Sequence, residues 1–182
     1  MKKDVKNLPG LLHVYIGYGK GKSTAALGLL LRAAGHGRRV LYGQFVKSGR
    51  SGEMKSLSLL GDQVKVWPTA QLQGFFSQLS QEEQAEATRA QRASLAEMAA
   101  EMGGGAYGLV IMDEALDLVD LGIVTAAELV ELAAGRPQET ELVFTGHNAG
   151  ELIIEAADYV TEFAARKHPY NEGVPARRGI EF

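Results

Sequence analysis

The segment Gly17-Tyr18-Gly19-Lys20-Gly21-Lys22-Ser23-Thr24 combines residue types that can hold a phosphate chain. Glycines let the backbone turn tightly, so that several N–H groups point inward, and a helix that begins near Lys22 would add a partial positive charge. Lys22 can neutralise phosphate oxygens, and Ser23 can ligate Mg²⁺. The pattern predicts a nucleoside triphosphate as ligand. The alternative is a plain glycine turn between a strand and a helix.

The spacing of this loop differs from the usual one. Four residues normally separate the first glycine from the Gly-Lys pair, and counting back from Gly21 reaches Ile16. With Gly17 as its first glycine the loop is one residue short, which predicts a tighter phosphate cradle. No G-x-G-x-x-G can be read from Gly17 or Gly19, so a dinucleotide-binding fingerprint is excluded.

A second candidate site follows the apolar run 109–112, which has the character of a buried strand. The run ends in Asp113 and Glu114, and proteins with a phosphate-binding loop use a carboxylate at this position to hold Mg²⁺ or its water. The alternative is that one of the two carboxylates caps the following helix. Spacing leaves open which of them touches the metal, so the predicted metal ligands are Ser23, Asp113 and Glu114.

Short apolar runs alternate with helical segments along the chain. The strand candidates are 13–16, 40–46, 64–67, 109–112, 142–145 and 159–163. Alternation of this kind is typical of parallel strands joined by helical crossovers. The sequence therefore predicts an α/β fold, a single P-loop NTPase-like domain with a mostly parallel central sheet and helices on both faces.

Helix signals agree with this arrangement. The predicted helices are 22–34, a long one that begins after Ser80 and ends before 103, and a shorter one that begins after Thr125 and runs toward 134. Ser80 with Glu83, and Thr125 with Glu128, have the spacing of capping boxes. Ligands bind in such folds where loops gather at the carboxyl ends of the strands. The stretches 48–56 and 68–80 are polar or glycine-containing and are predicted to be mobile loops over the site.

Composition narrows the class of protein. With 182 residues and 46% hydrophobic content, the chain suits one buried core, so 1–182 is expected to be a single domain with 1–10 as a mobile N-terminal extension. A net charge of −3 provides no basic field for nucleic acid. The chain has no cysteine, no apolar stretch of signal length at its start and no run of about 18 apolar residues. We expect a cytoplasmic protein without nucleic-acid or membrane partners.

The chain resembles a known family, the P-loop ATP:cob(I)alamin (corrinoid) adenosyltransferases, over nearly its whole length, from 14 to 182. The residues that carry the resemblance are Gly-x-Gly-Lys-Gly-Lys-Ser-Thr-Ala-Ala at 17–26, Arg32 before Gly-His-Gly at 35–37, Gln44-Phe45-x-Lys47, Gly52-Glu53, Asp113-Glu114, Arg136-Pro137, Thr145-Gly146, Lys-His-Pro-Tyr-Asn-x-Gly at 167–173 and Gly-Ile-Glu-Phe at 179–182. The shortened loop and the closing residues are more specific than a generic P-loop.

The resemblance implies transfer of the 5′-deoxyadenosyl group of ATP to the Co(I) centre of a corrinoid, with release of inorganic triphosphate. The acceptor would be cobalamin or cob(I)yrinic acid a,c-diamide, in the synthesis or salvage of adenosylcobalamin. Members of the family hold ATP in the reverse sense to ordinary P-loop enzymes. Because Co(I) is itself a strong nucleophile, the protein has to supply an in-line pose and charge neutralisation for the leaving triphosphate.

The resemblance also implies roles for individual residues. Lys20 and Lys22 would stabilise triphosphate charge, while Ser23 and Glu114 help to hold Mg²⁺. Arg32 would approach the adenosine end, although a basic residue near a helix C-terminus needs no ligand to explain it. The implied catalytic residues are Lys22, Glu114 and Phe75. The implied ATP- and corrinoid-binding residues are Gly17, Tyr18, Gly19, Lys20, Gly21, Lys22, Ser23, Thr24, Arg32, Phe75, Phe76 and His147.

Four positions depart from the family pattern. The loop that closes over the corrinoid often reads Gly-Phe-Thr-Trp, whereas 74–77 reads Gly-Phe-Phe-Ser, so Phe75 matches and Phe76 is the candidate substitute for the tryptophan. These aromatic residues help to displace the lower axial ligand of cobalt. The family's Thr-Gly-Arg ends in His147 here, which replaces a permanent charge by a group that titrates near neutrality. Tyr18 replaces the usual Asn or Asp, and 177–178 replaces a glutamine with arginines.

The expected partners are ATP and a corrinoid, with a flavoprotein as candidate reductant and a second copy of the chain in a homodimer. Two alternatives remain open on sequence grounds. The chain could be a P-loop kinase or ATPase that releases ADP, or an ATP-gated module that binds and carries a corrinoid. The four departures from the family pattern also permit a paralogue with altered corrinoid preference, slow turnover or a different acceptor.

Overall fold

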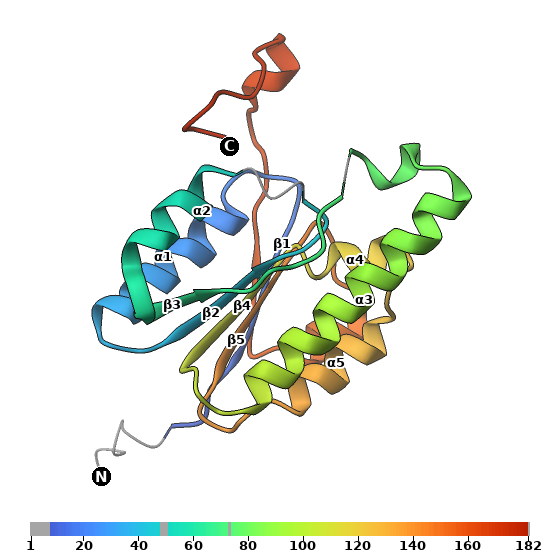
Figure 1. The fold of residues 1–182 in the computed structure, drawn as a ribbon. Helices are drawn as coiled ribbons and strands as arrows, with labels where there is room; N and C mark the ends of the chain where they lie inside the picture. Colours follow the sequence, from blue (N-terminus) through green and yellow to red (C-terminus); the bar gives the residue numbers. More distant parts are fainter. Residues whose placement is uncertain (1–7, 48–50, 73, 182) are drawn as a thin grey trace.

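The structure is a computed structural model that describes residues 8–47, 51–72 and 74–181, and these form one six-stranded sheet (Figure 1). The strands are β1 (Leu12–Ile16), β2 (Val40–Gln44), β3 (Val64–Val66), β4 (Leu109–Asp113), β5 (Glu141–Thr145) and β6 (Tyr159–Glu162). Their order is β3-β2-β4-β5-β1-β6, and every neighbouring pair is parallel. The predicted α/β fold is confirmed, with each strand within two residues of its predicted bounds.

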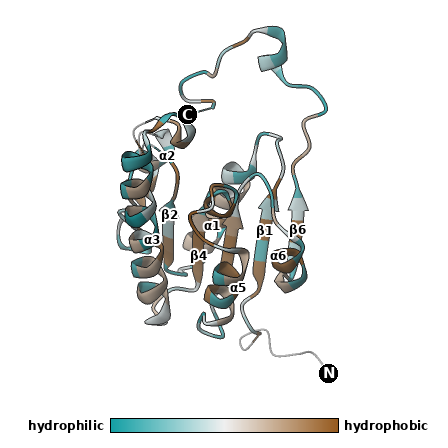
Figure 2. Ribbon diagram, turned by 90° about the vertical axis from the view of Figure 1, so that its right-hand side faces the viewer, coloured by the Kyte–Doolittle hydropathy of each residue, from teal (hydrophilic) through white to brown (hydrophobic). Residues whose placement is uncertain are grey.

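Helices cover both faces of the sheet. One face carries α1 (Lys22–Gly35) and α2 (Gly52–Leu57); the other carries α3 (Gln81–Gly103), α4 (Asp117–Asp120), α5 (Ala126–Ala134) and α6 (Glu151–Ala156) (Figure 1). Side chains of β4 alternate between two cores, since Leu109 and Ile111 pack under α1 while Val110 and Met112 pack under α3 and α5. Figure 2 shows hydrophobic strands enclosed between the helices.

Capping boxes mark the starts of α3 and α5. In α3 the Ser80 hydroxyl accepts the backbone N–H of Glu83 over 3.3 Å, and Glu83 Oε2 accepts the backbone N–H of Ser80 over 2.8 Å. Thr125 and Glu128 form the same capping box at the start of α5. Both capping boxes and the three predicted helices are confirmed.

The predicted mobile loops need correction. Positions 48–50 and 73 lie outside the described residues, but Gly52–Leu57 is the helix α2, and Phe76–Gln78 is a short 3-10 turn. A six-residue helix shows too little periodicity to be read from sequence. Residues 1–7 of the predicted N-terminal extension also lie outside the described residues. Gly10 belongs to the fold, because it is buried and its N–H donates to the carbonyl of Gln138 over 2.7 Å.

Topology gathers the predicted site residues at one edge of the sheet. β5 lies between β1 and β4, so the loops that follow these three strands meet at their carboxyl ends. The C-terminal segment 163–181 leaves β6, rises away from the sheet and returns toward α2 above the same edge (Figures 1 and 2). Among the described residues, no helix has the length and apolar character that a membrane span requires.

Candidate active site

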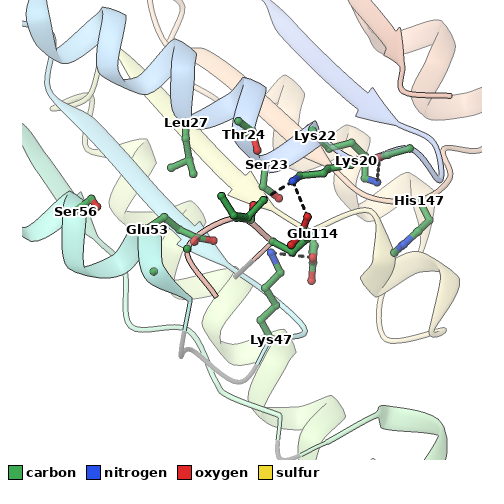
Figure 3. A pocket seen from close by; sticks show the side chains of 16 residues that line it. Lys20, Lys22, Ser23, Thr24, Leu27, Lys47, Glu53, Ser56, Glu114 and His147 are labelled. Atoms are coloured by element: carbon green, nitrogen blue, oxygen red, sulfur yellow. Dashed lines mark hydrogen bonds and ion pairs between the residues drawn. The ribbon is translucent and has the colours of Figure 1, made fainter. Parts of the chain in front are cut away.

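A cavity of about 460 Å³ opens at the carboxyl edge of the sheet (Figure 3). It is lined by Gly19, Lys20, Gly21, Lys22, Ser23, Thr24, Leu27, Lys47, Gly52, Glu53, Ser56, Glu114, His147, Gly179, Ile180 and Glu181. Three lysines and the N-terminus of α1 face this space, which therefore suits a polyanion. Figure 3 shows His147 at one end of the cavity, across from Glu53 and Ser56 of α2.

The phosphate loop packs tightly against the end of β6. The backbone N–H of Gly19 donates to the carbonyl of Phe163 over 2.7 Å. A Cβ atom at Gly17 or Gly19 would lie 2.4 or 2.5 Å from that carbonyl oxygen, so neither position has room for a side chain. Gly17 and Gly21 also have φ values of 111° and 120°, which favour glycine. The backbone alone therefore favours glycine at Gly17, Gly19 and Gly21.

The two loop lysines are held by oxygens of the protein. Lys22 Nζ donates to the carbonyls of Gly17, over 2.5 Å, and Gly19, over 3.3 Å. Lys20 Nζ lies 3.1 Å from Oε1 of Glu181 in the C-terminal segment. Hydrogen bonds from Arg177 lower the pKa of Glu181 to about 2, which keeps this carboxylate ionised. Oxygen atoms therefore already surround both ammonium groups where phosphate oxygens would bind.

Asp113 is fully buried at the end of β4 and accepts hydrogen bonds on both oxygens. Thr145 donates to Oδ1 over 2.6 Å, and Gln44 and Tyr42 donate to Oδ2 over 3.1 and 3.2 Å. Burial alone would raise the pKa of Asp113, but the Lys47 ammonium and these hydrogen bonds hold it below its ordinary value. Asp113 is a fixed negative charge under the cavity floor.

Glu114 lines the cavity itself. Its φ of 60° is unusual for a residue other than glycine, and its backbone N–H donates to the Thr145 hydroxyl over 2.8 Å. Burial, opposed by Lys47 and reinforced by Asp113, raises the pKa of Glu114 to about 7. Val46, which precedes Lys47, has a φ of 57°. The two positive φ angles therefore occur at Glu114 and just before Lys47, the two charged residues that follow β4 and β2 and line the cavity.

The oxygen donors at this place fit Mg²⁺. Lys47 Nζ lies 3.3 Å from Oδ2 of Asp113 and 3.0 Å from Oε1 of Glu114, so two carboxylates already converge on one cation. The Ser23 hydroxyl is close enough to contribute to the lowered pKa of Asp113. Mg²⁺ is usually bound by one or two carboxylates together with substrate phosphates. Ser23, Asp113 and Glu114 provide that donor set beside the phosphate loop.

The predicted site residues lie at different places relative to the cavity. Those that line the cavity are Gly19, Lys20, Gly21, Lys22, Ser23, Thr24, Glu114 and His147. Gly17 and Asp113 lie behind this lining, and the side chain of Tyr18 is 73% exposed beside His147, with ring centroids 5.4 Å apart. Arg32 lies in the last turn of α1, about 15 Å along the helix from Lys22.

The two phenylalanines of the corrinoid loop lie in different environments. Phe75 is 73% exposed, after Gly74 with a φ of 98°. Phe76 is partly buried against the core cluster that contains Leu95 and Met98. Phe75 is therefore free to contact a ligand, whereas Phe76 contributes to packing.

Several residues in or beside the cavity had no role in the sequence prediction. Lys47, Glu53 and Thr145 had no individual role in the sequence prediction, although Thr145 connects Asp113 to Glu114. Asp117 was overlooked entirely, yet it holds His147. The position of Lys47 and Thr145 at the carboxyl ends of parallel strands is the sequence signal that connects them to the site.

The parallel sheet, the phosphate loop at the start of α1 and the carboxylates after β4 define a P-loop nucleotide-binding protein. The particular family follows from comparison with known proteins. The family model described as "ATP:corrinoid adenosyltransferase BtuR/CobO/CobP" matches residues 9–182, and the chain belongs to this family.

Individual relatives agree with this assignment. The chain is 33% identical over 175 residues to the corrinoid adenosyltransferase of Pseudomonas aeruginosa, covering 95% of this chain and 84% of that protein. It is 31% identical over 174 residues to the corrinoid adenosyltransferase of Escherichia coli K12, covering 95% and 86%. It is 30% identical to the corrinoid adenosyltransferase CobA of Salmonella typhimurium, with the same coverage. The resemblance of the sequence to the corrinoid adenosyltransferases is thus confirmed.

Proposed function

We propose that the chain transfers the 5′-deoxyadenosyl group of ATP to the Co(I) centre of a corrinoid. The cobalt electron pair forms a Co–C bond to C5′, and the bond from C5′ to the triphosphate oxygen breaks with its electrons remaining on the triphosphate. The observation that supports this most strongly is the lysine-lined cavity, which combines the shortened phosphate loop with Glu114 in a chain of this family. No side chain has to act as nucleophile, so positioning and charge are the protein's contribution.

Triphosphate is the group that needs most help in this reaction, because negative charge develops on it as the bond breaks. Lys22 and Lys20 would exchange their present oxygen partners for phosphate oxygens. Thr24 and the backbone N–H groups of the loop would hold the triphosphate in place. Since Glu181 now lies against Lys20, the C-terminal segment would move or share that lysine when triphosphate binds. Charge neutralisation of this kind acts most strongly in the transition state.

We assign Mg²⁺ to Ser23, Asp113 and Glu114. Bound Mg²⁺ would neutralise further charge on the triphosphate. The Lys47 ammonium, which contacts both carboxylates, would then turn toward phosphate. The buried Asp113 suits a role in the outer sphere of the metal, and the cavity-lining Glu114 suits closer contact.

The corrinoid side of the site rests on the exposed aromatic Phe75, next to Gly74 with its φ of 98°. We propose that this side chain packs against the corrinoid and displaces the lower ligand of cobalt. Phe76 would support the loop from below because it packs against the core. Arg32 would reach the adenosine end only if ATP extends along α1 past Leu27, the last residue of that helix to line the cavity. A flavoprotein reductant, a homodimer and a cytoplasmic location complete the proposal.

The test is to mix the protein anaerobically with Mg·ATP and chemically reduced cob(I)alamin, and to follow the cobalt spectrum together with the phosphate product. We expect adenosylcobalamin to appear in step with inorganic triphosphate. ADP with an unchanged corrinoid spectrum would instead identify a kinase or ATPase. Tight corrinoid binding without either product would identify a carrier.

A further inference from the structure

Asp117 and His147 form a pair at one end of the cavity. The backbone N–H of His147 donates to Oδ1 of Asp117 over 2.7 Å, and Nδ1 of the ring lies 3.0 and 3.1 Å from the two carboxylate oxygens. The side chain of Asp117 is 11% exposed and that of His147 is 47% exposed. The carboxylate is therefore enclosed by the protein, while the ring reaches the cavity that it lines (Figure 3).

Close packing makes this pair specific. A Cβ atom at Gly146 would lie 2.9 Å from Oδ1 of Asp117 and 2.5 Å from Cβ of Leu116. Only glycine at this position lets α4 approach the loop after β5. The carbonyl of His147 in turn accepts the N–H of Gly17 over 2.9 Å. Asp117 is thus connected through the backbone of His147 to the first glycine of the phosphate loop.

The carboxylate of Asp117 determines which nitrogen of the His147 ring carries a hydrogen. An ionised carboxylate can only accept hydrogen bonds, so Nδ1 of His147 must carry the hydrogen that faces Asp117. In the neutral ring, Nε2 then has a lone pair, which repels a phosphate oxygen. In the protonated ring, Nε2 has a hydrogen, which can donate to it.

We propose that Asp117 is a positioning residue for the triphosphate: it holds His147 so that the imidazolium donates from Nε2 to the leaving triphosphate. The inference rests on the proposed function, and it gives the chain a titratable contact where the family pattern has an arginine. The ring replaces a permanent charge, so Asp117 has a task that a guanidinium would not require. Affinity for triphosphate should then be higher when the ring of His147 is protonated than when it is neutral.

Other charged groups face the same space and must be separated from His147. The groups on the elements packed around the ring are Asp117 and Asp120 of α4, Tyr18, Lys20 and Lys22 of the phosphate loop, Glu114 after β4, and Glu181 of the C-terminal segment. The contribution of His147 to triphosphate affinity is isolated only by comparing proteins that differ at His147 or at Asp117 and nowhere else. Omitting Mg²⁺ removes the competition between metal and proton at Glu114.

The experiment is calorimetric titration with inorganic triphosphate, without Mg²⁺, at intervals from about pH 6 to 8.5. The variants are Asp117→Asn, His147→Arg and the double substitution. Protonation of triphosphate itself is common to all proteins, so the informative quantity is the ratio of each dissociation constant to that of His147→Arg. For the parent protein, this ratio should rise about tenfold or more across the range, because a hydrogen bond to a charged partner is lost.

The double substitution separates a positioning role from a purely structural one. A guanidinium stays charged without help, so Asp117→Asn should weaken binding strongly beside His147 and only slightly beside Arg at 147. Equal weakening in both backgrounds at every pH would show that Asp117 only supports the fold and would overturn the proposal. A ratio that stays constant with pH in the parent would overturn it as well. Because the readout is binding of triphosphate, these results do not depend on whether the protein alkylates cobalt.

Discussion

The ammonium of Lys47 lies 3.0 Å from Oε1 of Glu114, and the same ammonium lies 3.3 Å from Oδ2 of Asp113. The contact joins the loops that follow two neighbouring strands, β2 and β4. One cation therefore balances two carboxylates at the place where the metal is proposed. Although burial opposes its charge, these carboxylates raise the pKa of Lys47.

Lys47→Met should lower the free energy of unfolding by about 3 kcal/mol, because a buried ion pair that loses one partner leaves an uncompensated charge. Excess MgCl₂ should recover more stability in the variant than in the parent, since Mg²⁺ restores the missing positive charge. Urea unfolding with and without MgCl₂ measures both effects. Lys65→Met is the control: Lys65 pairs with Glu101 at the surface, so almost no change in stability and no response to MgCl₂ are expected. An identical MgCl₂ response in Lys47→Met and parent would contradict the metal assignment.

The raised pKa of Glu114, about 7, predicts how the metal dependence varies with pH. Metal binding requires the carboxylate, so a proton competes with Mg²⁺ below pH 7. The gain in ATP affinity from Mg²⁺ should fall about tenfold between pH 8 and pH 6, as expected for one proton displaced from a group with this pKa. Glu114→Gln should remove this dependence, as measured by titration with ATP in the presence and absence of Mg²⁺.

Glu114 also links pH to stability, in the opposite sense to a salt-bridged carboxylate. Its pKa in the folded protein lies above the ordinary value of 4.5, so the folded state binds the proton more tightly than the unfolded state does. The protonated carboxyl contributes stability below about pH 4.5, and this contribution is lost as pH rises through about 7. Without metal, Glu114→Gln should therefore be more stable than the parent at pH 8. Lower stability of the variant at that pH would show that the carboxylate is better compensated than proposed.

The phosphate loop offers a sharp steric prediction. Gly19→Ala places Cβ 2.5 Å from the carbonyl oxygen of Phe163, so the loop must move away from β6. ATP affinity should fall at least about tenfold, because loop N–H groups no longer converge. Gly28→Ala, in open space on the following helix α1, should keep ATP affinity and gain up to about 1 kcal/mol of stability. Unchanged ATP binding in Gly19→Ala would mean that the loop does not hold phosphate in this conformation.

Features that depend on a few neighbouring residues were predicted correctly from the sequence. The capping boxes at Ser80 and Thr125 are complete within four residues, and the sequence therefore located the starts of α3 and α5 correctly. Strand positions followed from apolar runs for the same reason. α2 was missed because six residues, opened by a glycine, carry almost no periodic signal.

Contacts that depend on the order of the strands in the sheet could not be predicted from the sequence. Thr145 reaches Asp113 only because β5 lies beside β4, and Lys47 reaches the same carboxylate because β2 lies on the other side. The pair of Asp117 with His147 joins positions 30 residues apart through a close approach at Gly146. The residue types alone identified the phosphate loop. The partner of each charged side chain, in contrast, depends on the order of the strands in the sheet.

Lys22 is expected to act mainly in the transition state. Lys22→Ala should lower kcat about 100- to 1,000-fold, as for other preorganised contacts to developing charge, and raise the KM for ATP less. Lys55→Ala is a matched control on α2, where the lysine is exposed and outside the cavity lining, and should leave both constants unchanged. Steady-state rates with cob(I)alamin and Mg·ATP provide the comparison. A normal kcat in Lys22→Ala would contradict the assignment of the triphosphate to this loop.

Phe75 and Phe76 are expected to separate corrinoid chemistry from folding. Phe75→Ala removes an exposed ring, so stability and ATP affinity should stay unchanged while the rate from cob(II)alamin with a reductant falls about tenfold. Phe76→Ala removes a ring packed on the core and should cost about 2 kcal/mol of stability, less than for a fully buried phenylalanine. Leu59→Ala, at an 85% exposed position in another part of the fold, controls for the loss of surface apolar area. If Phe75→Ala and Leu59→Ala gave equal rates, the aromatic contact with the corrinoid would be ruled out, and the ring at Phe75 would have no part in preparing cobalt for alkylation.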